Sequence, residues 1–92
     1  MYVEEFGSPG TLTAEAAEEL AAGATGYTGR ITVAANEHVV NLPVLPWCWA
    51  ELGIGPGTRV TVTADGGHRP PDLEDRRALD VLVARFRALT GT

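Results

Sequence analysis

The chain has 92 residues, which is enough for one small domain with a single hydrophobic core and too few for two. With 45% hydrophobic and 21% charged residues, its composition is that of a globular protein, which excludes a disordered or collagen-like chain. The formal net charge of −5 would repel a phosphate backbone, and no basic stripe offsets it, so we expect no nucleic-acid partner.

Residues that could hold a metal or form a cross-link are scarce. Cys48 is the single cysteine, so an internal disulfide is excluded, and neither His38 nor His68 lies at a metal-ligand spacing from it. No apolar run approaches the roughly 18 residues of a membrane span, and segment 1–7 lacks the basic start of a signal peptide. We therefore expect a cytoplasmic protein with no metal, no cofactor and no membrane partner.

The first part of the chain predicts a strand and then a helix. Residues 1–6 are strand-like, and the turn-forming segment Gly7–Gly10 closes the strand. From Ala14 onward the apolar residues recur at helical spacing, Thr13 is a natural N-cap, and Gly26 supplies a stop. The residues that lie away from the apolar face of this helix are Glu15, Glu18, Glu19 and Ala22.

The middle of the chain predicts a hairpin followed by a short helix. Segments 31–35 and 38–42 are expected to be strands, joined by a tight turn at Asn36–Glu37. The apolar segment 45–52 has a proline suited to a first helical turn and ends at Gly53, which indicates a helix of about two turns.

The last part predicts a strand, a loop and the longest helix. Residues 58–64 alternate valine with polar side chains, which is typical of a strand with one buried face. Segment Gly67–Pro71 is interpreted as a stiff surface connector, and Asp72 can cap a helix over 73–89. The order β-α-β-β-α-β-α predicts a single α+β domain over 1–92, with helices on one face of a four-stranded, mainly antiparallel sheet.

That order and several short strings resemble the histidine phosphocarrier (HPr) family. The strings are ATGYT at 24–28, ITV at 31–33, LGI at 52–54, VTV at 60–62 and ADG at 64–66. Their spacing agrees with the family over nearly the whole chain, apart from short insertions before the second and third helices. The resemblance implies an HPr-like open-faced β-sandwich.

The resemblance also implies where a phosphate would be accepted. In the family, a histidine at the start of the first helix takes phosphate from Enzyme I and passes it to sugar-permease subunits. An arginine follows it two positions later, and then a proline. The corresponding positions here are Thr13, Glu15 and Ala16, so the resemblance implies a degenerate acceptor site and no catalytic residue.

Two of these replacements disfavour phosphohistidine chemistry on physical grounds. An imidazole nitrogen is a nucleophile that also leaves easily at neutral pH, whereas the Thr13 hydroxyl is a weak nucleophile whose ester transfers poorly. A carboxylate at Glu15 repels phosphate oxygens that an arginine would pair with. Capping of the helix alone explains Thr13 as well.

The family binds its protein partners through the first two helices, which implies a partner surface here. Trp47 is a plausible anchor of that surface, because tryptophan is enriched among binding hot spots, although partial burial against a neighbouring loop is an alternative. Trp49 matches a core position and is expected to be buried, and Cys48 to be half-buried. The implied partner-binding residues are Ala14, Glu15, Glu18, Ala22, Pro46, Trp47 and Ala50.

These observations favour a non-enzymatic, HPr-like protein-interaction or regulatory module related to the phosphoenolpyruvate-dependent sugar phosphotransferase system. One alternative is a phosphocarrier of that system with an atypical acceptor, His38 or His68, although both histidines are expected to be solvated. A third hypothesis is an accessory subunit of an unrelated enzyme that has the same fold.

Overall fold

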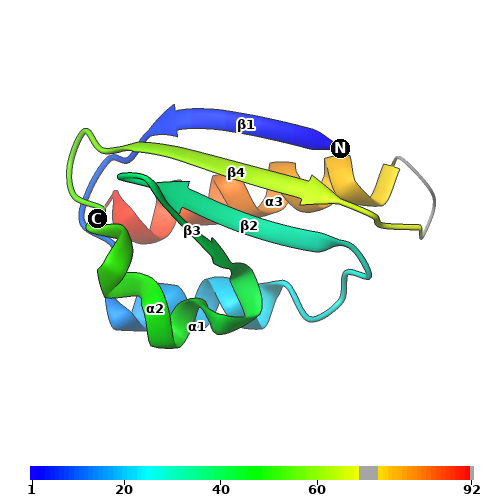
Figure 1. Ribbon diagram of the computed structural model, residues 1–92, viewed down its shortest axis with the longest axis horizontal. Coiled ribbons are helices and arrows are strands. Elements are labelled where there is room, and N and C mark those ends of the chain that lie inside the picture. Colours follow the sequence, from blue (N-terminus) through cyan, green and yellow to red (C-terminus); the bar gives the residue numbers. More distant parts are fainter. Residues whose placement is uncertain (69–72, 92) are drawn as a thin grey trace.

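A computed structural model describes residues 1–68 and 73–91. One four-stranded antiparallel sheet, in the order β1-β4-β2-β3, is covered on one face by three helices, while the other face is open (Figure 1). The expected α+β architecture is therefore confirmed. The elements are β1 (Tyr2–Gly7), α1 (Ala14–Gly23), β2 (Arg30–Ala35), β3 (His38–Asn41), the 3₁₀ turn η1 (Leu42–Val44), α2 (Leu45–Leu52), β4 (Arg59–Asp65) and α3 (Leu73–Thr90).

The core lies between the sheet and the helices, and the period-2 pattern of the strands supplies the sheet side of it. In β4 the valines Val60 and Val62 are buried while the threonines between and after them face the open side. The helices contribute Leu20 and Phe86 among others, and Phe86 meets Phe6 of β1 edge-on at 5.3 Å between ring centroids. The predicted buried faces of β2 and β4 are thus confirmed.

Helix α1 begins where the sequence predicts and ends earlier. Thr13 is the N-cap, but the helix stops at Gly23 and not at Gly26. The last turn is closed by the Ala24 N–H, which bonds to the carbonyls of Ala21 and Ala22. In a longer helix the Ala22 carbonyl would accept from the Gly26 N–H, but here it accepts from the Thr25 hydroxyl at 3.0 Å and from the Thr25 N–H at 3.4 Å.

The β2–β3 hairpin is tied to the end of α2. Asn36 and Glu37 have φ angles of 50° and 70°, which give the left-handed turn that fits the twist of a two-residue hairpin. The Asn36 amide donates to the Leu52 carbonyl at 2.7 Å and to the Gly53 carbonyl at 3.2 Å. The hairpin tip therefore satisfies two carbonyls that the end of a helix leaves without partners.

The second strand of the hairpin is one residue shorter than predicted. Leu42 was expected in the strand, but it starts the 3₁₀ turn η1, in which Pro43 cannot donate to a sheet ladder. Helix α2 follows directly and ends at Gly53, whose φ of 59° is the left-handed conformation expected of a helix stop.

Two buried carboxylates at the N-terminal end of α3 bind the loop before β2 and the loop after β4. Glu74 and Asp75 are only 4% and 5% exposed. Glu74 accepts hydrogen bonds from the Thr28 and Gly29 backbone N–H groups at 2.9 and 3.0 Å and from the Thr28 hydroxyl at 2.8 Å, while Asp75 accepts from the Gly67 N–H at 3.0 Å. We call Glu74 and Asp75 the carboxylate clasp. The predicted cap Asp72 and the loop residues 69–71 lie outside the described residues.

Hydrogen bonding also sets the ionisation of Glu74. Burial raises the pKa of Glu74, but the hydrogen bonds donated by Thr28 and by the Gly29 N–H, together with attraction to His68, outweigh burial. The pKa of Glu74 therefore lies below its ordinary value, and the side chain is held as a carboxylate.

Candidate functional site

The start of α1 is built around Thr13, as the sequence predicts. The Thr13 hydroxyl oxygen accepts from the Ala16 N–H at 3.1 Å, and its carbonyl accepts from the Ala17 N–H at 2.9 Å. The preceding residue is fixed as well, because the Leu12 N–H donates to the Ile54 carbonyl at 3.1 Å. The Thr13 side chain is exposed and already serves as the helix cap, which confirms its capping role.

The residues that follow Thr13 divide between surface and core. Glu15 and Glu18 are exposed, as are Ala14 and Ala22, whereas Ala16 is 3% exposed and belongs to the core. Ala16 nevertheless forms part of a groove that runs between α1 and the end of α3. The lining residues of this groove are Thr13, Glu15, Ala16, Glu18, Glu19, Ala22 and Leu89.

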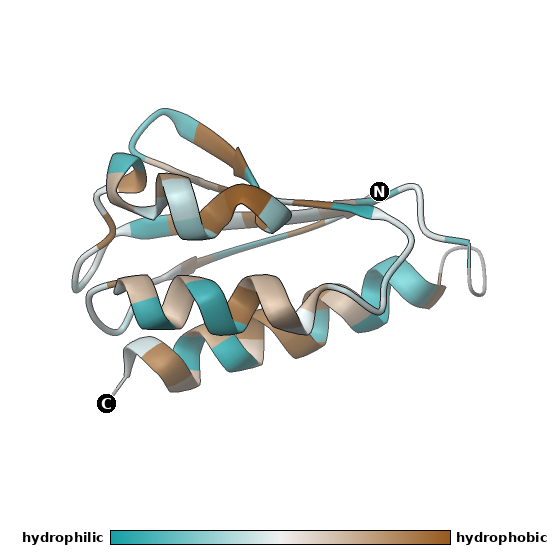
Figure 2. Cartoon of the chain, turned by 90° about the horizontal axis from the view of Figure 1, so that it is seen from below, coloured by the Kyte–Doolittle hydropathy of each residue, from teal (hydrophilic) through white to brown (hydrophobic). Residues whose placement is uncertain are grey.

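Helix α1 lies between α2 and α3 and presents its outer side to solvent (Figure 2). On the α3 side, the Glu19 carboxylate accepts from the Arg85 guanidinium at 2.7 Å, in an ion pair that is half exposed. On the other side α1 packs against α2. The exposed residues of the two helices therefore form adjoining surfaces.

Trp47 is the most exposed large apolar side chain in the described residues, at 80%. The expectation that it could be partly buried against a loop is wrong. Ala50 is also exposed, while Pro46 is half-buried. Trp49 and Cys48 are half-buried and pack against the core, so the burial expected of Trp49 is found in part and the prediction for Cys48 is confirmed.

Two apolar residues that sequence reasoning did not assign extend this surface. Pro43 and Val44 in η1 are exposed, Val44 at 43%. The 3₁₀ turn brings them out of the strand pattern, and the only sequence signal was the unbroken apolar run from Leu42 to Trp47. We call Ala14, Glu15, Glu18, Ala22, Pro43, Val44, Pro46, Trp47 and Ala50 together the α1–α2 surface.

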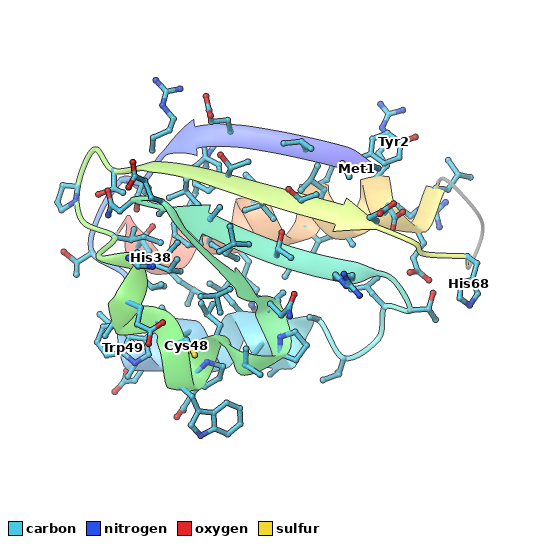
Figure 3. The ribbon with its side chains drawn as sticks, viewed as in Figure 1. Met1, Tyr2, His38, Cys48, Trp49 and His68 are labelled. Atoms are coloured by element: carbon cyan, nitrogen blue, oxygen red, sulfur yellow. The ribbon has the colours of Figure 1, made fainter. Side chains whose placement is uncertain are left out.

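The two histidines lie toward opposite ends of the molecule (Figure 3). Both are exposed, as expected. His68 lies beyond β4, with its ring 3.2 Å from the Gly66 carbonyl, at the end of the molecule opposite the start of α1. His38 begins the edge strand β3, and among residues 1–68 and 73–91 its ring has no hydrogen-bond partner.

Metal sites and membrane spans are absent from the part of the chain that the structure describes. No group of three or more histidine, cysteine or acidic side chains is arranged there to hold a metal ion. None of the described helices combines the length and the apolar character that crossing a bilayer requires.

Known proteins resemble this chain in structure, while comparisons of its sequence find no match. No protein-family model matches the sequence, and no curated protein matches it significantly. Among solved structures, HPr-C-His from Thermoanaerobacter tengcongensis has a TM-score of 0.78 at 20% identity, covering 100% of this chain and 98% of that one.

Two further solved structures of phosphocarrier proteins are also similar to this chain. The histidine-containing phosphocarrier protein from Mycoplasma has a TM-score of 0.72 at 26% identity, covering 94% of both chains. The phosphocarrier protein HPr from Bacillus anthracis has a TM-score of 0.68 at 20% identity, covering 92% of this chain and 98% of that one. The chain therefore has the fold of the HPr phosphocarrier proteins, which confirms the resemblance seen in its sequence.

Proposed function

We propose that the protein is a cytoplasmic, HPr-like interaction or regulatory module, related to the phosphoenolpyruvate-dependent sugar phosphotransferase system, that does not carry phosphohistidine. The observation that carries this proposal is the start of α1, where the position implied for the acceptor holds a threonine. The Thr13 hydroxyl is engaged as a helix cap, and the exposed carboxylate of Glu15 follows two residues later.

The chemistry of that position supports binding over transfer. The first histidine in the chain is His38, so no imidazole is available in β1 or α1. A phosphate at the start of α1 would meet favourable N–H groups but also the negative field of Glu15, which acts against it. What remains is a capped helix beside an exposed tryptophan.

The test is a phosphorylation assay that uses the whole chain, Enzyme I and phosphoenolpyruvate, with intact mass as the readout. We expect no mass increase of one phosphate, while an HPr phosphocarrier in a parallel reaction gains an acid-labile one. The double substitution Thr13→His and Glu15→Arg is expected to restore part of the acceptance, because it returns both a nucleophile and a phosphate-pairing cation. An acid-labile phosphate on the unsubstituted chain would overturn the proposal.

A phosphocarrier with an atypical acceptor is the second candidate, and His38 is the residue that favours it. His38 is exposed and lies on an edge strand at the same end of the molecule as the start of α1 (Figures 1 and 3). This candidate predicts a phosphate that disappears with His38→Ala and persists with His68→Ala. The opposite pattern, or no phosphate, would eliminate His38 as the acceptor.

A further inference from the structure

The apolar part of the α1–α2 surface has the character of a binding site. Trp47 is 80% exposed and Val44 is 43% exposed, and both lie in one continuous stretch of η1 and α2. A tryptophan held on a rigid helix loses little conformational freedom on binding and gains a large buried area, which is why such residues dominate binding energies.

The charges on the same helices all have one sign. Residues 14–23 contain three glutamates and residues 42–52 contain Glu51, and neither segment contains a lysine, arginine or histidine. Four of the seven arginines belong to α3 instead. Among the described residues the single ion pair made by these glutamates is the one between Glu19 and Arg85.

We infer that the α1–α2 surface docks a protein partner whose contact face combines an apolar pocket for Trp47 with a strip of arginine or lysine side chains opposite Glu15 and Glu18. This inference rests on the proposed function, since it names the chemistry of the partner of that module. Charge complementarity carries it, because a neutral partner would desolvate the glutamates without pairing them and an acidic partner would be repelled.

The same charges oppose a second copy of this chain as the occupant. A two-fold symmetric contact places the same patch of both copies face to face. Because residues 14–23 and 42–52 contain no lysine, arginine or histidine, the same surface of a second copy would bury Glu15 and Glu18 without offering them a cation.

The inference can be tested with a displayed library of random peptides, which imposes no charge on the ligand in advance. The purified full chain is the bait, and the selected pool is compared with the starting library. We expect selected peptides to be enriched in arginine or lysine together with aliphatic or aromatic residues. A synthetic peptide of the selected sequence should lose about tenfold in affinity when salt is raised from 0.05 to about 0.5 M, because salt screens exposed ion pairs.

Matched variants assign the binding to the surface. Trp47→Ala is expected to weaken the selected peptide at least about 30-fold, as for a hot-spot residue. The double substitution Glu15→Gln and Glu18→Gln is expected to weaken it about fivefold and to reduce the salt dependence. The control is the double substitution Glu4→Gln and Glu5→Gln, which removes the same number of charges from β1, at the opposite edge of the sheet. It should change neither the affinity for the peptide nor the salt dependence of binding.

Several outcomes would overturn the inference. A basic partner at this surface would be contradicted if the selected peptides were neutral or acidic, or if no peptide were selected. It would also be contradicted if the Glu4/Glu5 variant lost as much affinity for the peptide as the Glu15/Glu18 variant. A concentration-dependent dimer that disappears with Trp47→Ala would assign the surface to a second copy. None of these results involves phosphate, so they are distinct from failure of the proposed function, which the Enzyme I assay detects separately.

Discussion

Two regions of this small domain are rich in carboxylates, and the fold treats them in opposite ways. At the start of α3, the carboxylate clasp of Glu74 and Asp75 is almost completely buried, and backbone N–H groups from two loops pair with it. On α1, Glu15 and Glu18 are exposed, and the described structure pairs neither with a cation. Buried acids without partners are too costly to persist, so the first pair holds the fold together, while the second is available for a partner.

The largest effect is expected from crowding the clasp. A Cβ on Gly29 would lie 2.5 Å from an Asp75 carboxylate oxygen and 2.8 Å from both the Asp65 carbonyl and the Gly67 nitrogen, and two of these neighbours are backbone atoms that cannot move aside. We expect Gly29→Ala to lower the free energy of unfolding by about 3 kcal/mol in urea titrations. Gly26→Ala, in the same loop but with no atom within 4 Å of the new Cβ, is the control. Equal stabilities of the two variants would contradict the described packing.

An intermediate effect is expected from the charge of Glu74. Because the pKa of folded Glu74 lies below its ordinary value of 4.5, its stabilisation is fully present above the unfolded-state pKa and is lost as pH falls through the folded pKa. Urea unfolding from pH 7 down to pH 3 should therefore show a decline below about pH 5 that Glu74→Gln reduces. The same substitution should lower stability at pH 7, because an amide accepts fewer of the three hydrogen bonds. The control Glu15→Gln should change neither the loss of stability in acid nor the stability at pH 7. If it reduced the loss in acid as Glu74→Gln does, the exposed glutamates of α1 would also be structural.

The smallest effect on stability is expected on the α1–α2 surface. Trp47→Ala should change the free energy of unfolding by no more than about 0.5 kcal/mol, because the side chain is 80% exposed. Trp49→Ala, two residues along the same helix, should cost about 2 kcal/mol, because that indole packs against the core. Thermal unfolding followed by circular dichroism measures both. A large loss from Trp47 would mean that it supports the fold and is not reserved for binding.

Most of the architecture could be predicted from local sequence chemistry. The alternation in β4 defined its buried face, Thr13 marked the start of α1, and Gly53 marked the end of α2, because each signal depends on the backbone within a few residues. The errors came where a side chain or a turn competed with the regular pattern. The Thr25 hydroxyl helped to end α1 early, and η1 removed Leu42 from β3.

The candidate site could be predicted only in part. The exposed acidic side of α1 followed from helical periodicity, and the resemblance indicated Pro46, Trp47 and Ala50. The exposures of Trp47 and Trp49 did not follow, because in a helix of eight residues almost every position is apolar and periodicity cannot select the buried face. Val44 was missed for a related reason, since the turn that exposes it has no periodic signature.

The sequence by itself determined the order of the elements, the single core, the capped start of α1 and the absence of a histidine before His38, because these depend on residue identity and near-neighbour spacing. Only the tertiary structure decided which carboxylates are structural. Glu74 accepts a hydrogen bond from Thr28, a residue 46 positions earlier in the chain. No local sequence pattern predicts a contact between residues so far apart in the chain, because it forms only when the elements pack together. The same packing leaves Trp47 uncovered, and it is this contrast that makes the α1–α2 surface the candidate for binding.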